Sequence, residues 1–121
     1  MSYDISFKVK VEGIENRYVE VGECNANITW NLGTMIRVST GLEWNNEENN
    51  GLCKDVIPKI VSGLAELMKH PSKYKKYEAP NGWGTIEGCK RFFTRIINDW
   101  EAFCEDSWLG DLQDVTYFWI E

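Results

Sequence analysis

Residues 85–104 read T-I-E-G-C-K-R-F-F-T-R-I-I-N-D-W-E-A-F-C, and this stretch decides the fold. Its apolar side chains recur at steps of three and four residues, which places them along one stripe of a helix. They are Ile86, Cys89, Phe92, Phe93, Ile96, Ile97, Trp100, Phe103 and Cys104. Thr85 is a preferred N-cap residue, and Glu87 puts a carboxylate in the first turn. We expect this helix to be the main element of the core.

Two earlier segments predict further helices. Apolar residues from Val56 to Met68 follow the same steps, and Pro58 is expected in the first turn, where its missing N–H has no cost. Apolar spacing predicts a short helix over residues 32–40, with Asn31 as its N-cap and Gly41 at its end.

The two ends of the chain predict strands. Apolar and polar residues alternate over residues 3–12, and extended character resumes at residues 17–21 after a turn, which predicts a hairpin. In residues 115–120 both alternate sets are β-branched or aromatic, so we expect a strand that is buried on both faces and pairs with the hairpin. The prediction is an α+β fold, in which about three helices cover one face of a small antiparallel sheet.

Composition and length limit the class of protein. With 121 residues, of which 43% are hydrophobic, and with no linker or repeat, residues 1–121 predict a single α+β domain. The chain has no apolar signal segment after Met1 and no apolar run long enough for a membrane span, which predicts a cytoplasmic protein. Four cysteines without a C-x-x-C pair, together with one histidine, predict reduced, mostly buried thiols and no metal or cofactor.

Common catalytic motifs are missing from the sequence. It lacks G-x-S-x-G, a Walker A loop, G-x-G-x-x-G and H-E-x-x-H. His70 stands beside Pro71 among lysines rather than near a nucleophile, and the adjacent acids Glu47 and Glu48 are a weak sign of acid–base chemistry. An enzyme that uses carboxylates or Cys24 is therefore the least favoured class, and we lean towards a protein without catalytic activity.

The net charge of −6 argues against direct binding to nucleic acid backbones, which depends on lysine and arginine. The charge is also uneven, because no lysine or arginine follows Arg95. An alternative function follows: an acidic inhibitor that binds a host protein or imitates nucleic acid. It requires five acids to gather on one exposed surface, namely Asp99, Glu105, Asp106, Asp111 and Asp114.

The polar segment at residues 24–31, C-N-A-N-I-T-W-N, predicts a shaped loop. If it is extended, Asn25, Asn27, Thr29 and Asn31 project to one side, opposite Ala26, Ile28 and Trp30. Such a row of amides and hydroxyls offers donors and acceptors to a polar ligand. The alternative is a loop whose polar groups satisfy their own backbone and cap the next helix.

A second informative loop is N-G-W-G at residues 81–84. Gly82 and Gly84 permit backbone angles that other residues avoid, so the loop can fix the orientation of Trp83 and place Thr85 at a helix N-terminus. The free N–H groups of that terminus suit an anion or a polar ligand atom. The alternative is that Trp83 fills the core.

Together the two loops predict a binding site for a small polar ligand, a class that includes nucleotides. Its candidate residues are Asn25, Asn27, Thr29, Trp30, Asn31, Asn81, Trp83 and Thr85. A ring of the ligand would stack on Trp30, Trp44 or Trp83, and the hypothesis requires the two loops to meet in space. The partner is then a small ligand or a host protein, and six tryptophans leave a homo-oligomer open.

The motifs N-I-T-W-N-L-G-T-M-I-R at residues 27–37 and P-N-G-W-G-T at residues 80–85 resemble those of an uncharacterised family of small bacteriophage and prophage proteins. The resemblance covers roughly residues 22–104, whereas the opening hairpin and the acidic C-terminal strand are less typical. It implies a phage origin, and with it a role in host interaction or defence evasion. It implies no particular activity.

Overall fold

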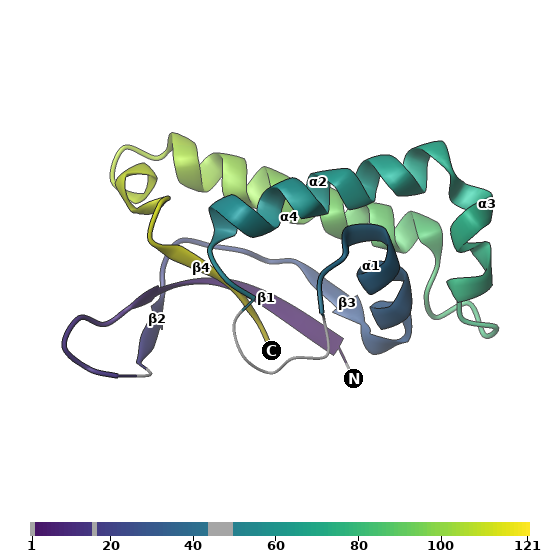
Figure 1. The fold of residues 1–121 in the computed structure, drawn as a ribbon, viewed down its shortest axis with the longest axis horizontal. Helices are drawn as coiled ribbons and strands as arrows, with labels where there is room; N and C mark the ends of the chain where they lie inside the picture. The colour runs from purple at the N-terminus through teal and green to yellow at the C-terminus, as the bar shows by residue number, and fades with distance from the viewer. Residues whose placement is uncertain (1, 16, 44–49) are drawn as a thin grey trace.

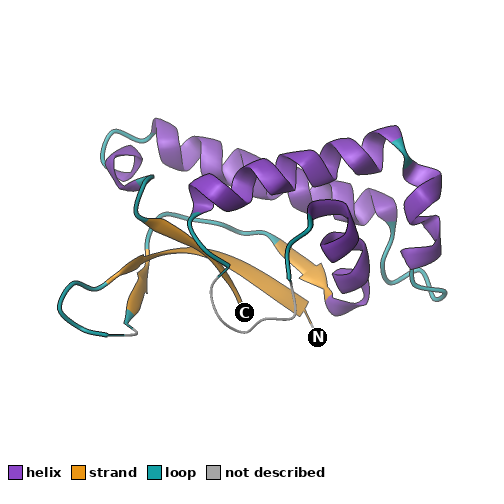
Figure 2. Cartoon of the chain, viewed as in Figure 1, coloured by secondary structure: helices purple, strands orange, loops and turns teal. Residues whose placement is uncertain are grey.

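The computed structural model describes residues 2–15, 17–43 and 50–121. Within these ranges it has an α+β fold, as the sequence predicts, with four antiparallel strands and four α-helices. The sheet forms one layer, and α2 (Cys53–Lys69) and α4 (Ile86–Glu105) run side by side over one of its faces (Figures 1 and 2). In these ranges no helix is long and apolar enough to cross a membrane.

The central strand is β1 (Ser2–Lys10), which pairs with every other strand. These are β2 (Tyr18–Glu20), β3 (Asn27–Thr29) and β4 (Thr116–Ile120). The N–H of Ile5 bonds to the carbonyl of Ala26, and the carbonyl of Phe7 accepts from Val21, so β2 and β3 lie along the same edge of β1. Asp4 exchanges two bonds with Glu121 on the other edge, which belongs to β4.

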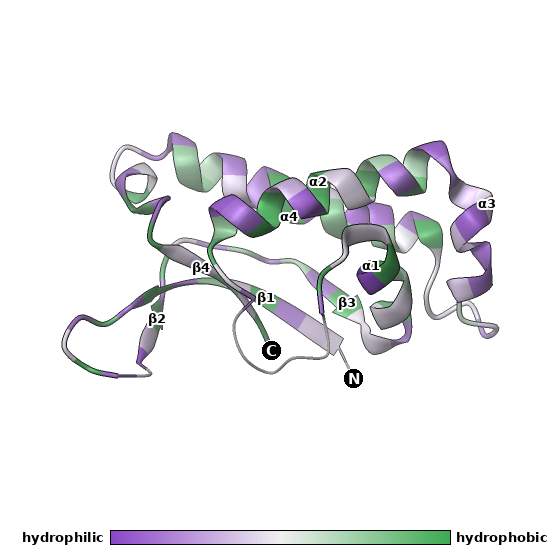
Figure 3. Ribbon diagram, in the orientation of Figure 1, coloured by the Kyte–Doolittle hydropathy of each residue, from purple (hydrophilic) through white to green (hydrophobic). Residues whose placement is uncertain are grey.

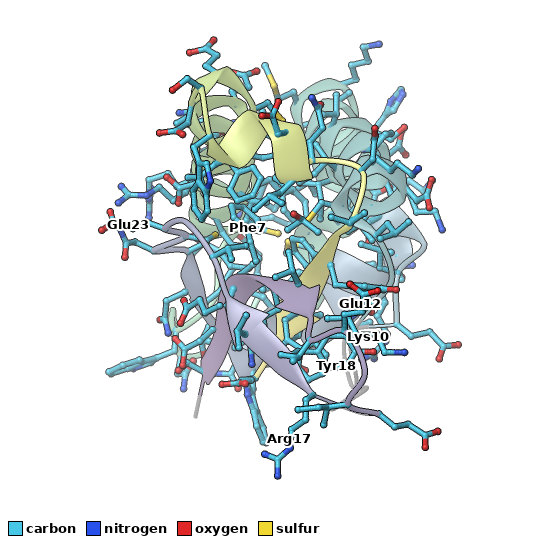
Figure 4. The ribbon with its side chains drawn as sticks, turned by 90° about the vertical axis from the view of Figure 1, so that its left-hand side faces the viewer. Phe7, Lys10, Glu12, Arg17, Tyr18 and Glu23 are labelled. Carbon is cyan, nitrogen blue, oxygen red and sulfur yellow. The ribbon has the colours of Figure 1, made fainter. Side chains whose placement is uncertain are left out.

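The core lies between the sheet and the helices. The stripe predicted for α4 is buried from Ile86 to Phe103, with only Ile97 and Cys104 partly exposed. Figure 3 shows apolar and polar residues alternating around both long helices. Phe7 packs against Trp100 and Phe103, with ring centroids 5.3 and 5.6 Å away. It points between the two layers in Figure 4, whereas Arg17 and Glu23 point outward.

The remaining helical segments are short. They are η1 (Trp30–Leu32), α1 (Gly33–Thr40), α3 (Pro71–Tyr74), η2 (Lys75–Tyr77) and η3 (Leu109–Leu112). Gly41 ends α1 in the left-handed conformation at φ 79°, which confirms its predicted C-cap role. Asn31 as the N-cap of this helix is wrong: α1 begins after Leu32, and the Thr29 side chain caps the preceding η1 turn by accepting the N–H of Asn31.

Two other expectations about the helices and loops are wrong. Because α2 begins at Cys53, Pro58 lies in the helix interior rather than the first turn, with its ring exposed to solvent. Residues 24–31 are not all loop, since Asn27–Thr29 forms β3 against the first residues of β1. Asparagine disfavours strands locally, and pairing with β1 together with burial of Ala26 and Ile28 overrides this preference.

The C-terminal strand is buried on one face only. Thr116, Phe118 and Ile120 are buried beneath the helices, whereas Tyr117 and Trp119 are half-buried on the opposite face. There the ring centroid of Tyr18 lies 5.4 Å from that of Tyr117 and 4.9 Å from that of Trp119. The prediction of two buried faces is wrong because the helices cover only one side of the sheet (Figure 1).

Candidate functional site

The two polar loops meet beside the N-terminal half of α4. The side-chain amide of Asn31 donates to the carbonyl of Trp83 at 3.5 Å. Residues 25–29, residues 82–85 and the exposed side chains of α4 border one open groove of about 970 Å³, with Leu64 and Met68 of α2 also in its lining. Residues more than fifty positions apart in the sequence therefore share one surface.

Most side chains of the first loop bond within the chain. Asn27 donates its amide to Asp4 and, at 3.1 Å, to the hydroxyl of Ser2, which places it on the helix-free face of the sheet. The hydroxyl of Thr29 accepts the N–H of Asn31 at 3.4 Å. These bonds match the interpretation of a self-satisfied loop. The exposed side-chain amide of Asn25 has no hydrogen bond to any other described residue.

Trp30 departs from the predicted alternation. It is 47% exposed because the chain turns into η1 at this position. Its indole N–H donates to the carbonyl of Ser2 at 2.7 Å, and its ring stacks on Tyr3 with centroids 5.7 Å apart. Trp30 thus anchors the end of β3 to β1. Trp44, Glu47 and Glu48 lie outside the described residues.

Trp83 is the most exposed large apolar residue of the groove, at 72%, so it does not fill the core. The side-chain oxygen of Asn81 accepts the backbone N–H of Trp83 at 3.0 Å, and the side-chain amide of Asn31 donates to the carbonyl of Trp83. Gly82 has φ 77°, as the turn requires. Gly84 instead lets the loop backbone pack closely against Leu32, because a Cβ at this position would lie 3.1 Å from the Leu32 side chain. The backbone of Trp83 is fixed, and its indole faces solvent.

The N-terminus of α4 is already capped by the chain. The hydroxyl of Thr85 accepts the N–H of Gly88 at 3.0 Å, which confirms its predicted N-cap role. The carboxylate of Glu78 accepts the N–H of Ile86 at 2.9 Å. Lys75, whose Nζ lies 2.7 Å from Glu78 Oε1, and then the Ile86 N–H lower the pKa of Glu78. Glu78 therefore holds the position where we expected an anionic ligand.

Three basic side chains of α4 line the groove, and sequence reasoning did not select them as site residues. Lys90 pairs with Glu87 at 2.9 Å, and Arg95 uses its Nε for Asp99 at 3.4 Å. The exposed guanidinium of Arg91 has no ion pair or hydrogen bond within the described ranges. The lining thus carries three cations against one acid, Glu87, in a chain of net charge −6. The sequence did contain a sign of this basic surface: Arg91 and Arg95 are four residues apart, which places them on the same polar face of the predicted helix.

The cysteines offer no activated nucleophile among the described residues. All four are free, with Cys53 and Cys89 buried and Cys24 and Cys104 half-buried. Burial raises the pKa of Cys24 and of Cys89 to about 12, so each is a neutral thiol at pH 7. Within the same ranges, no group of three or more His, Cys, Asp and Glu side chains is placed to hold a metal ion.

Two of the five acids required by the inhibitor alternative are engaged within the chain. Asp99 accepts the N–H of Asn25 at 3.0 Å and also pairs with Arg95. Asp106 accepts the N–H groups of Leu109 and Trp108, both at 2.9 Å, and these bonds lower its pKa. Glu105, Asp111 and Asp114 are exposed.

Comparison with known proteins adds no relative. No family model matches the sequence, and neither a curated protein nor a solved structure matches the chain. The resemblance to phage-encoded proteins therefore stays a prediction that rests on the two loop motifs.

Proposed function

We propose that this protein is a non-enzymatic cytoplasmic binder of a small polar ligand, which it holds in the groove between β3 and α4. The observation that carries the proposal is Trp83. An indole ring gains free energy when it is buried, yet this one stays in solvent on a backbone fixed by Asn31 and Asn81. A fixed, exposed aromatic ring beside donor groups suits stacking on a planar ligand.

The surrounding groups give the site its polarity. Asn25 and Asn98 offer amides, and Lys90, Arg91 and Arg95 offer positive charge along the same groove. The acidic alternative has less support, because Asp99 and Asp106 already bond within the chain. A role in host interaction or defence evasion is part of this proposal, and the resemblance of the loop motifs to phage proteins is its only support.

Native mass spectrometry of the protein recovered from producing cells tests the proposal. We expect a small molecule bound to the wild-type protein, lost in Trp83→Ala and retained in Trp108→Ala. Trp108 is a matched control, since it is 67% exposed and lies outside the groove lining. Recovery of a protein partner without any small ligand, or equal retention of the ligand in both variants, would overturn the proposal. The same spectra report a homo-oligomer directly.

A further inference from the structure

One edge of β3 carries backbone donors that face α4. Ala26 uses its backbone oxygen on β1, and Ile28 stands opposite Tyr3 in the same register. Backbone groups alternate between the two edges of a strand, so the N–H groups of Asn25, Asn27 and Thr29 point away from β1. In the described part of the chain, no further strand pairs with this edge.

Asp99 shows what this edge binds. Its carboxylate accepts the N–H of Asn25 at 3.0 Å and lies 3.4 Å from the Nε of Arg95. One anionic group is thus held jointly by a backbone donor of the strand edge and by a guanidinium of the helix. The contact with Asp99 is made by Nε of Arg95, and the guanidinium has two terminal nitrogens that can donate to a further acceptor.

The same two kinds of donor, strand N–H groups and helix guanidinium groups, continue along the groove beyond Asp99. Asn25 lies beside Asp99, and Asn31 beside Trp83, so the strand runs antiparallel to α4. Two extended residues rise about 6.6 Å, the length of about four helical residues. From Asp99, this spacing brings Asn27 level with Arg95 and Thr29 level with Arg91. All four residues line the groove.

We propose that the ligand is a phosphate ester of nucleotide type, whose phosphoryl oxygens bind Arg91, Arg95 and the N–H groups of Asn27 and Thr29. This inference rests on the proposed function and names the chemical class of its ligand. Guanidinium and backbone N–H groups are the usual partners of phosphoryl oxygens. The two positions lie about 6–7 Å apart along the strand, which suits phosphates joined through one sugar. Trp83, at the end of the groove, receives a base.

Isothermal titration with four probes tests the inference: adenosine, adenosine monophosphate, the dinucleotide pApA and a single-stranded DNA 12-mer. We expect the monophosphate and pApA to bind and adenosine to bind far more weakly. Arg91→Gln should lower the affinity for pApA about 10- to 100-fold, because one charge-assisted contact is lost. Arg91→Lys should recover part of this loss. Arg17→Gln removes the same charge from the β1–β2 hairpin (Figure 4) and should leave binding unchanged.

The outcomes separate the two proposals. Equal binding of adenosine and its monophosphate, or full pApA affinity in Arg91→Gln, overturns the phosphate inference and leaves a small-ligand site in place. Binding of the 12-mer alone supports phosphate recognition and overturns the small-ligand function. No binding of any probe overturns the phosphate inference, and a small molecule found by native mass spectrometry would then keep the proposed function.

Discussion

Gly63 of α2 lies in close contact with both α1 and α4. It is buried, and a Cβ at this position would lie 2.6 Å from the methyl group of Thr40 and 3.3 Å from the ring of Phe93. Thr40 has little freedom to move away, because its hydroxyl donates to the carbonyl of Ile36 at 2.6 Å and accepts the N–H of Leu42. At this position the packing requires the smallest side chain, even though glycine weakens a helix.

Gly63→Ala should therefore destabilise the protein despite the better helix propensity of alanine. Propensity favours alanine by about 1 kcal/mol, whereas overpacking costs about 1–3 kcal/mol, so we expect a net loss of roughly 1 kcal/mol by urea denaturation. Ser62→Ala, at the exposed neighbouring position, is the control and should be neutral or slightly stabilising. A Gly63→Ala protein more stable than wild type would contradict this packing argument.

At the scale of elements, the beginning of α4 is fixed by two oxygens from outside the helix. Thr85 directly precedes the helix in sequence, whereas Glu78 directly follows η2 and lies eight residues before Ile86. A negative charge at a helix N-terminus is stabilised by the helix dipole and by unsatisfied N–H groups. Because this terminus also borders the groove, Glu78 helps to position Trp83 and Arg91 relative to β3.

Glu78→Gln should lower stability by about 1 kcal/mol at pH 7, through loss of the charge-assisted bond and of the dipole interaction. The folded pKa of Glu78 lies below its ordinary value. Its contribution is therefore present above about pH 4.3 and is lost as the pH falls through the folded pKa. Thermal melts from pH 7 to pH 2 should show the two proteins converging in acid.

Glu101→Gln serves as the control for this experiment. Glu101 is exposed in the same helix, so the same chemical change there should alter stability by less than about 0.5 kcal/mol at every pH. If Glu78→Gln were as stable as wild type at pH 7, or if the difference grew in acid, the capping role of Glu78 would be wrong.

At the scale of the whole molecule, a single core joins residues from the sheet and from every long helix. Cys53 and Cys89 report on its integrity, since both are fully buried, one in α2 and one in α4. The carboxyl end of α4 and the amino end of α2 lie above the β4 side of the sheet (Figure 1). The groove is lined by the part of α4 that precedes Asp99.

Iodoacetamide labelling at pH 8, followed by peptide mass spectrometry, should leave Cys53 and Cys89 unmodified in the native protein. Burial excludes the reagent, and raised pKa values suppress the thiolate. Their labelling should appear only with denaturant and should follow the global unfolding curve. Cys104, half-buried near the end of α4, should react first. Native labelling of Cys89 ahead of Cys104 would show that the core opens differently.

Local pattern was sufficient to predict much of this fold and part of the site. Because the stripe of α4, the alternation of β1, the Thr85 cap and the Gly41 stop depend on neighbours within four or five residues, they can be read directly. The sequence placed Asn27 and Trp83 in two loops; in the structure both line one groove, but Asn27 lies in strand β3. The bonds from the Asn27 amide to Asp4 and Ser2 depend on pairing with β1 and have no local signal.

By itself, the sequence determined an α+β protein whose main helix begins directly after its N-cap, Thr85, and whose first strand has one apolar face. It did so because apolar residues recur every two residues in a half-buried strand and about every 3.6 residues in a half-buried helix, and both patterns can be seen in the sequence. Only the tertiary structure decided that β3 joins β1, that Glu78 occupies the N-terminus of α4, and that Arg91 and Arg95 line one groove together with β3. These features join residues far apart in sequence, and their geometry follows from packing the sheet against the helices.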